Sequence, residues 1–440
     1  MTKSAIKKIL VIGSGGREHA ICLALKNSAK NYSQECEIFA IPGNAGTRRI
    51  AKNIENIAIS DFEKIITFCK SNKIDFVFVG SEQPLTLGIV DELQKNNIAV
   101  FGPNKKASQL EGSKIFMKKI ADENNIPTAK YQSFDFDNEI SALEFIKNIN
   151  FPCVIKTDGL ASGKGVIIAC DFNDAKLNIS EIFRGKFGDA GKKIIIEEFL
   201  KGFEVSYFII CDGKNFLPIG FAHDHKKVGE GETGLNTGGM GSYSPSAKIN
   251  KSIEEKIIEK IIKPTLQGMA KIDAPFVGIL FAGLMIDNDD IKLLEFNIRL
   301  GDPETQVLLP RLDCNFIELI ESAIFGKLDQ FKIKFFEEKK LVCVVICAKG
   351  YPQEFRKGIE IKNLNLIEDQ LIENNDSSLQ LIHAGTNWID NKIIANSGRV
   401  LNVVASASTI EEARRKAYDL IAKINWDEGF VRNDIAKDVS

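Results

Sequence analysis

Paired cysteines, clustered histidines and long apolar runs are all missing from this chain of 440 residues. The nine cysteines are scattered and none forms a C-x-x-C unit, so we expect reduced, small apolar side chains. Only four histidines are present, which disfavours a zinc site even at His223-Asp224-His225. The basic segment 1–8 precedes an apolar stretch of only Ile9–Ile12, too short for a signal peptide or a membrane span.

An excess of charge of one sign is also lacking, because the formal net charge is only −2. This balance gives no general attraction to nucleic acid or to an anionic membrane, so we expect a cytoplasmic protein that binds neither. Any phosphate group on a ligand must then be held by a local site. A monomer or a weak homo-oligomer is expected.

Strands and helices alternate through the N-terminal part of the chain. Short apolar runs closed by glycine or proline predict strands at Lys8–Gly13, Glu37–Pro42, Asp75–Gly80 and Ala99–Pro103. Helical periodicity separates them at Glu18–Lys30, Asp61–Asn72 (with Asp61 as N-cap) and Pro84–Asn96. This alternation predicts a parallel sheet built from βαβ units.

After about residue 105 the regular alternation of strands and helices ends. For the whole chain we predict an α/β fold, with α+β parts. We expect three domains, at 1–104, 105–334 (with a lid at about 127–200) and 335–440. Helices are expected at Lys105–Asn125, Ser252–Ile272 and Thr409–Ile424, and strands at Cys153–Thr157, Val166–Ala169, Lys193–Phe199 and Leu341–Ala348. A polar, glycine-dense loop is expected at Val228–Ser246.

The first glycine-rich stretch runs from Gly13 through Gly15, Gly16 and Arg17 to Glu18 and follows the first expected strand. A dinucleotide fingerprint would need a third glycine where Glu18 stands. Backbone N–H groups at a helix N-terminus, with Arg17 beside them, can still bind an anion. Phosphate binding is therefore favoured over a plain tight turn, and NAD binding is disfavoured.

The second glycine-rich stretch, Gly159–Gly165, fails as a P-loop because its glycines are too close and Gly165 follows the lysine. It joins two expected strands, and glycines let such a loop close over a triphosphate as a lid. Lys156, at the end of the first strand, is placed to contact phosphate. An ordinary hairpin connection is the alternative.

An acidic strand is expected at Leu294–Arg299. Alternation places Glu295, Asn297 and Arg299 on one face, and Leu294, Phe296 and Ile298 on the other. A carboxylate and an amide oxygen so placed suit Mg²⁺, which completes its shell with water and nucleotide phosphate. Arg299 is suited to a bidentate grip on a carboxylate substrate. A solvated polar face is the alternative.

Three more segments carry ligand-binding side chains or glycines. Gly301–Gln306 is dense in ligating groups and opens an expected helix, and Asn236–Gly241 suggests a backbone-lined cradle, with a surface turn as the alternative. Asp224, Lys226 and Lys227 suit polar contacts to a phosphorylated substrate, with a charged surface turn as the alternative.

Together these motifs resemble the ATP-grasp superfamily and, within it, the phosphoribosylamine–glycine ligases, also called glycinamide ribonucleotide synthetases. The resemblance runs almost end to end and rests on Gly15–Ala20, Pro42–Thr47, Gln109–Lys114, Lys156–Gly165, Glu197–Leu200, Asn236–Gly241, Glu295–Asn297, Gly301–Gln306 and His383–Thr386. The family commonly has Pro, Arg and Phe where this chain has Ser81, Lys227 and Leu300, none of which is a proposed metal or triphosphate ligand.

The resemblance implies roles for individual residues. ATP would be bound by Lys114, Lys156, Gly159, Ser162, Gly163, Lys164, Gly165, Glu197, Glu198, Phe199, Leu200 and Glu204, and Mg²⁺ or Mn²⁺ by Glu295 and Asn297. Glycine and 5-phosphoribosylamine would be bound by Gly15, Gly16, Arg17, Asn44, Gly46, Thr47, Glu82, Asp224, Lys226, Thr237, Gly238, Gly239, Met240, Gly241, Arg299, Gly301, Asp302, Pro303 and Glu304. The catalytic residues would be Lys156, Glu295 and Arg299.

The implied reaction makes a glycyl phosphate that the amine of phosphoribosylamine attacks, with charge neutralised by metal and lysines behind a closed lid. Three alternatives remain open: another ATP-grasp ligase or carboxylase, a nicotinamide-dependent dehydrogenase, and a nucleotide sensor without turnover.

Overall fold

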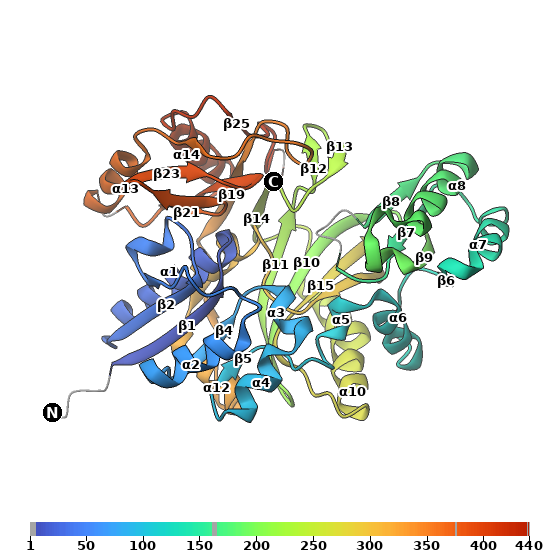
Figure 1. The fold of residues 1–440 in the computed structure, drawn as a ribbon, viewed down its shortest axis with the longest axis horizontal. Helices are drawn as coiled ribbons and strands as arrows, with labels where there is room; N and C mark the ends of the chain where they lie inside the picture. The colour runs from blue at the N-terminus through green and yellow to red at the C-terminus, as the bar shows by residue number, and fades with distance from the viewer. Residues whose placement is uncertain (1–5, 161–164, 375, 438, 440) are drawn as a thin grey trace.

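The computed structural model describes residues 6–160, 165–374, 376–437 and 439. An N-terminal sheet with its helices lies at the lower left of Figure 1, a small lid lies at the right, and a C-terminal layer lies at the upper left. A large central sheet connects them. Among the residues described, no helix is both long and apolar enough to cross a membrane.

The N-terminal sheet has five strands in the order β3-β2-β1-β4-β5, all paired in parallel. Its strands are β1 (Lys7–Gly13), β2 (Cys36–Pro42), β3 (Lys52–Asn53), β4 (Phe76–Val79) and β5 (Val100–Phe101). Residues Ile9–Ile12 are fully buried, as expected for a parallel strand covered on both faces. The predicted parallel sheet is confirmed.

Helix α1 (Gly16–Asn31) packs beside this sheet, and α2 (Phe62–Asn72) begins at its predicted cap. The Asp61 carboxylate accepts a hydrogen bond from the Lys64 N–H at 3.2 Å, which confirms the cap.

The two helices predicted next are each broken, so both predictions of one continuous helix are wrong. Gly88, with φ of +98°, separates α3 (Glu82–Leu87) from α4 (Ile89–Lys95), because glycine accepts this left-handed backbone. Ser113 separates α5 (Gln109–Gly112) from α6 (Lys114–Glu123), since its extended backbone caps α6.

The central sheet has nine strands, eight of them in the order β16-β15-β10-β11-β14-β19-β24-β21, with β25 beside β19. Their bounds are β10 (Phe203–Asp212), β11 (Phe216–Asp224), β14 (Gly241–Ser244), β15 (Val277–Asp287), β16 (Asp290–Asn297), β19 (Lys340–Ala348), β21 (Leu379–His383), β24 (Arg399–Ala407) and β25 (Gly429–Phe430). Strand β14 joins the second and third expected domains because it pairs with both β11 and β19.

The expectation of a plain loop at Val228–Ser246 is therefore wrong. Besides β14, this segment contributes most of the two-stranded hairpin of β12 (Lys227–Gly229) and β13 (Thr233–Asn236). Its glycines lie both within these short strands and in the turns between them, so the composition alone resembles that of an irregular chain.

The lid has its own antiparallel sheet, β6-β9-β7-β8, and its own apolar core. The strands are β6 (Tyr131–Asp135), β7 (Cys153–Thr157), β8 (Val166–Ala169) and β9 (Lys193–Glu198), and the helices are α7 (Glu139–Ile146) and α8 (Phe172–Glu181). Both β7 and β8 match their predictions. Figure 1 shows the lid projecting from the rest of the molecule.

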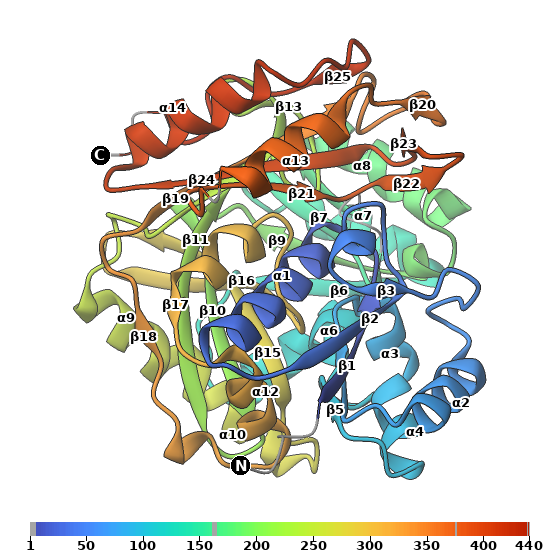
Figure 2. The ribbon, with the colours of Figure 1, turned by 90° about the vertical axis from the view of Figure 1, so that its left-hand side faces the viewer.

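Helices complete the other layers. They are α9 (Lys251–Ile257) and α10 (Lys263–Lys271), joined by a π-helical turn, α11 (Thr305–Leu308), α12 (Phe316–Ile324), α13 (Leu364–Glu373) and α14 (Ile410–Ile421). Helix α14 covers the C-terminal strands, and a small sheet of β20 (Ile359–Glu360), β22 (Thr386–Ile389) and β23 (Lys392–Ala395) lies to its right in Figure 2.

One apolar cluster crosses all three expected domains, since it contains Ile21 of α1, Phe208 of β10 and Val404 of β24. Its shared burial fixes the domains relative to one another. The cysteines are all unpaired and mostly buried, as predicted, but Cys170 is exposed, and Cys36 and Cys314 are partly so.

Candidate active site

A β-bulge shapes the end of β16. The ladder with β15 shifts register between Leu293 and Glu295, so that Leu294 is an extra residue. Strict alternation predicted that Leu294 shares the core face with Phe296 and Ile298. This is wrong for Leu294, which is only partly buried, whereas the other two are 2% and 1% exposed.

Glu295 and Asn297 lie at this end of the strand. Burial favours the neutral form of Glu295, but Lys114 and Lys226 help to lower its pKa, so the carboxylate is ionised at neutral pH. Asn297 Oδ1 accepts a hydrogen bond from Arg299 Nη2 at 3.2 Å. Among the described residues no group of three or more His, Cys, Asp or Glu could hold a metal. The two oxygen donors fit Mg²⁺, which would then take its other ligands from phosphate and water.

Arg299 is fixed by carboxylates from two other elements. Its Nε lies 3.2 Å from Glu82 of α3, and its Nη2 lies 2.8 Å from Glu111 of α5. Burial opposes ionisation of Glu82, but Arg299 and Arg17 outweigh it and lower its pKa to about 2. No role for Glu111 was predicted, although it is the acidic residue of the Gln109–Lys114 motif.

The first glycine loop is organised by Glu18. Its carboxylate, 1% exposed, accepts from the Gly15 N–H at 2.6 Å and pairs with Arg17 Nε at 2.6 Å. The Gly15 N–H expected to face an anion is thus bonded to the loop's own side chain. The residue that breaks the dinucleotide fingerprint fills the space beside the loop, against Gly13 and Gly80.

The Asn44 turn ties the N-terminal sheet to the C-terminal layer. Asn44 Nδ2 donates to the carbonyls of Ser14 and His383, each at 2.9 Å, and its Oδ1 accepts from the Gly46 and Thr47 N–H groups. This side chain therefore sets the shape of the turn as well as its distance from the glycine loop.

The second glycine loop is fastened to the N-terminus of α6, where Lys114 lies. Asp158 Oδ1 accepts from the Ser113 hydroxyl at 2.9 Å and from the Ile115 N–H at 3.0 Å. The Thr157 N–H donates to the Gly165 carbonyl at 2.9 Å, closing the loop at its base. Ser162, Gly163 and Lys164, predicted to contact ATP, lie outside the described residues.

The hinge segment Glu197–Leu200 directs its first side chain inward. Glu197, 2% exposed, lies with Oε2 2.8 Å from Lys156 Nζ. Glu198 is partly exposed and accepts a hydrogen bond from the N–H of Lys130, the residue before β6. Phe199 is 39% exposed, so an apolar surface is available beside the hinge.

A group of acidic side chains lies between β10, β11 and the segment after β16. Glu204 pairs with Lys226, and Glu304 accepts from the Ser206 hydroxyl at 3.2 Å. Burial and the neighbouring Glu304 raise the pKa of Asp224 well above its usual value. Among the described residues, its buried Oδ1 has no hydrogen-bond partner, so it suits a donor from a ligand.

The expected cradle at Thr237–Gly241 lies against that group. The Thr237 hydroxyl donates to the Lys226 carbonyl at 2.9 Å. Gly239 has φ of +114°, and a side chain there would clash with Pro303 and Asp224. A glycine is therefore required for the cradle to approach the acidic residues.

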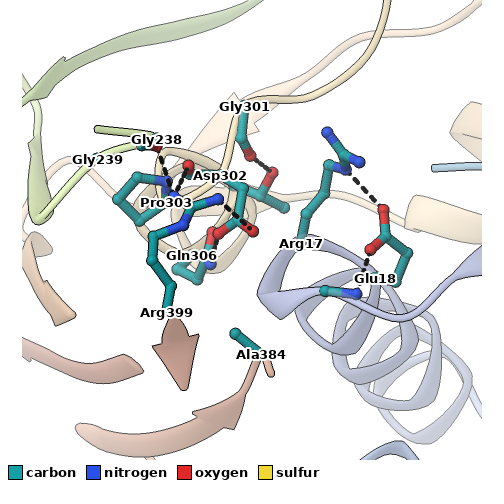
Figure 3. A network of polar contacts seen from close by, with 12 residues as sticks. Arg17, Glu18, Gly238, Gly239, Gly301, Asp302, Pro303, Gln306, Ala384 and Arg399 are labelled. Carbon is teal, nitrogen blue, oxygen red and sulfur yellow. Dashed lines mark hydrogen bonds and ion pairs between the residues drawn. The ribbon is translucent and has the colours of Figure 1, made fainter. Parts of the chain in front are cut away.

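Arg399 of β24 joins this cradle to the segment after β16, as Figure 3 shows. Its guanidinium donates to the carbonyls of Gly238 and Asp302 and lies 3.2 Å from the Asp302 carboxylate. Gln306 Nε2 donates to the same carboxylate at 2.7 Å. Sequence reasoning missed Arg399, because only the fold brings the C-terminal layer to this point.

Contacts to Glu82 and Glu111 hold Arg299 beside the end of β16, and Lys156 reaches the same strand at the Leu294 carbonyl. The chain that builds this arrangement is similar to known proteins. The family models for phosphoribosylglycinamide synthetase match this chain with the N domain at residues 7–111, the ATP-grasp (A) domain at 112–305 and the C domain at 341–438.

Two curated relatives are similar over nearly their whole length. The phosphoribosylamine–glycine ligase of Brucella melitensis is 44% identical over 97% of this chain and 97% of its own. That of Caldanaerobacter subterraneus subsp. tengcongensis is 44% identical over 98% of this chain and 99% of its own.

Two solved structures are also similar to this chain. The phosphoribosylamine–glycine ligase of Thermotoga maritima has a TM-score of 0.80 at 32% identity, over 97% of this chain and 100% of that chain. A biotin carboxylase domain of Hydrogenobacter thermophilus 2-oxoglutarate carboxylase has a TM-score of 0.70 at 15% identity, over 97% and 92%, and shares the fold alone. The chain belongs to the phosphoribosylglycinamide synthetase family.

Proposed function

We infer that this protein joins glycine to 5-phosphoribosylamine in an ATP-driven reaction that yields glycinamide ribonucleotide, ADP and phosphate for purine biosynthesis. The observation that carries this inference is 44% identity, over 97% of the chain, to a ligase of that activity. It is an ATP-dependent carbon–nitrogen ligase. A cytoplasmic location, a monomer or weak homo-oligomer, and the domain division 1–104, 105–334 and 335–440 are parts of the same proposal.

The triphosphate lies, in this proposal, between the lid and the end of β16. Glu295 and Asn297 would hold Mg²⁺, with Mn²⁺ as the alternative, and the metal would supply neutralisation of phosphate charge. Lys114 and Lys156 add positive charge from the protein. The hinge Glu197–Leu200 receives the adenine, with the exposed Phe199 ring giving apolar contact.

Glycine is activated through its carboxylate. A carboxylate oxygen attacks the γ-phosphorus, ADP leaves, and a glycyl phosphate forms. Arg299 orients the carboxylate, because Glu82 and Glu111 hold its guanidinium in one place. The lid keeps water away from the acyl phosphate, which water would otherwise hydrolyse.

The amine of phosphoribosylamine then attacks the acyl carbon. The new C–N bond forms as the C–O bond to phosphate breaks, and the proton lost by the amine passes to the departing phosphate. Asp224 would position the amine of phosphoribosylamine for this step, because its buried Oδ1 can accept a hydrogen bond from an amine N–H. The cradle Thr237–Gly241 and the segment Gly301–Glu304 line the remainder of the pocket.

The test is ADP release from Mg·ATP and glycine, with and without phosphoribosylamine generated in the cuvette. We expect release that requires both substrates. ADP release with a different carboxylate or amine, and none with these two, would replace the proposal by another ATP-grasp ligase. ATP binding without turnover under any of these conditions would indicate a sensor.

The dehydrogenase alternative rests only on the first glycine loop. Glu18 fills the space beside that loop, which opposes close approach of a dinucleotide. Titration with NADH, followed by its fluorescence, should give no binding.

A further inference from the structure

A lysine that the proposed reaction does not use lies at the base of the lid. Lys118 of α6 is fully buried, with an exposed fraction of 0%. Its ammonium donates to the Thr128 hydroxyl at 2.8 Å and the Ala129 carbonyl at 3.2 Å, and lies 4.9 Å from the centre of the Tyr131 ring. A buried lysine is costly unless an opposite charge compensates it.

That opposite charge is Glu197, which two lysines share. Lys118 Nζ lies 3.0 Å from Glu197 Oε1, and Lys156 Nζ lies 2.8 Å from Glu197 Oε2. The first contact is an ion pair that is not aligned as a hydrogen bond. Burial lowers the pKa of Lys118 and Glu197 opposes this shift, so the ammonium form of Lys118 depends on Glu197.

Lys118, Lys156 and Glu197 form a trio with two positive charges and one negative charge, so one positive charge is in excess. All three side chains are almost fully buried, so solvent screens their interactions little. Lys156 also donates to the Leu294 carbonyl at 3.1 Å, on the bulge next to Glu295. Lys156 therefore reaches the end of β16, whereas Lys118 remains behind Glu197.

We propose that Lys118 is a positioning residue for the nucleotide, because it neutralises Glu197 from within and so leaves the charge of Lys156 available to phosphate. Without Lys118, Glu197 would hold Lys156 as its sole counter-ion and the trio would carry no net charge. The inference rests on the proposed function, since it assumes that Lys156 meets the triphosphate.

The test is the affinity for Mg·ATP of Lys118→Met and of the double variant Lys118→Met/Glu197→Gln, measured by calorimetry without other substrates. Lys118→Met should weaken binding by about tenfold or more, with the KM for glycine unchanged. The double variant removes one charge of each sign, restores the excess positive charge on Lys156, and should bind ATP better than Lys118→Met does.

Two controls separate this effect from damage to the lid. Lys119→Met removes an exposed neighbouring lysine of α6, and Thr128→Val removes the hydroxyl that Lys118 contacts without changing any charge. Both should bind ATP like the unmodified protein. Thermal unfolding of every variant reports folding.

The double variant is compared with Glu197→Gln alone, because both share any loss of an adenine contact. If Lys118 acts through Glu197, removing it from Glu197→Gln should leave ATP affinity nearly unchanged, and this comparison holds even if Lys118→Met alone does not fold. A double variant that binds ATP about tenfold more weakly than Glu197→Gln would overturn the proposal and leave Lys118 with a structural role. Unmodified protein that binds no Mg·ATP at all would instead overturn the proposed function.

Discussion

Two charged regions meet at the end of β16, and they differ in origin and in charge. The phosphate cluster comes from the ATP-grasp part alone and consists of Lys114, Lys118, Lys156, Glu197 and Glu295. The arginine network comes from all three parts of the chain and consists of Arg17, Glu18, Glu82, Glu111, Arg299, Asp302 and Arg399. Lysines outnumber carboxylates in the first, and carboxylates outnumber arginines in the second.

The difference teaches how one site divides two tasks. A lysine ammonium is a point charge on a flexible stem, so it can follow a phosphoryl group as that group moves. An arginine held between carboxylates, such as Arg299 between Glu82 and Glu111, has a fixed plane and fixes the orientation of what it binds. Under the proposed function, the phosphate cluster would supply charge and the arginine network would supply geometry.

Glu295→Ala should have the largest effect, because the proposed partner of this carboxylate is the metal. We expect kcat to fall by roughly a hundredfold or more, while the thermal midpoint of unfolding changes little. Steady-state ADP release at saturating Mg²⁺ measures it. Turnover close to that of the unmodified enzyme would remove Glu295 from the metal site.

Arg299→Lys keeps the charge of the network but loses its geometry, since one ammonium cannot hold Glu82 and Glu111 together. We expect kcat/KM for glycine to fall by about tenfold to a hundredfold, with little change in ATP affinity. Arg415→Lys, at an exposed ion pair on α14, is the matched control. An equal fall in ATP affinity and in kcat/KM for glycine would mean that the two regions do not act on separate substrates.

Arg399→Met tests whether the C-terminal layer serves one substrate only. Loss of the contacts to Gly238 and Asp302 should loosen the cradle and raise the KM for phosphoribosylamine by about tenfold. The affinity for ATP, measured by calorimetry, should stay the same. Weaker ATP binding would show that the arginine network also supports the phosphate cluster.

His19→Gln addresses the pH dependence of the junction near the arginine network. Burial and the nearby His383 lower the pKa of His19 to about 3, so the folded protein keeps it neutral. An unfolded histidine titrates near pH 6.5, so this contribution to stability is complete above that pH and is lost as the pH falls toward 3.

Urea unfolding at pH 7 and pH 5 measures the His19 contribution. The unmodified protein should lose about 1 to 2 kcal/mol more between these pH values than His19→Gln does. Identical losses in the two proteins would show that other groups account for the acid sensitivity.

Local patterns predicted local structure well. The strands β7 and β8 and the Asp61 cap follow from short-range signals, namely apolar runs between glycine turns and a carboxylate before a helix. The break at Gly88 was missed, because a glycine inside a periodic segment is compatible with both a continuous and an ended helix.

Long-range features could not be predicted in this way. Strand β14 lies in a stretch with the composition of a loop and is a strand only because β11 and β19 flank it. Arg399 has no local pattern that marks it, and the motif around Glu111 does not reveal its partner, because both side chains pair with residues far away in the sequence.

The sequence by itself determined the α/β architecture and the family, because periodicity, glycine motifs and their order are properties of the chain. Only the tertiary structure decided which charges meet. Glu197 became the shared partner of Lys118 and Lys156, and Arg399 reached Asp302, because burial of apolar surface across the domains brings distant side chains together.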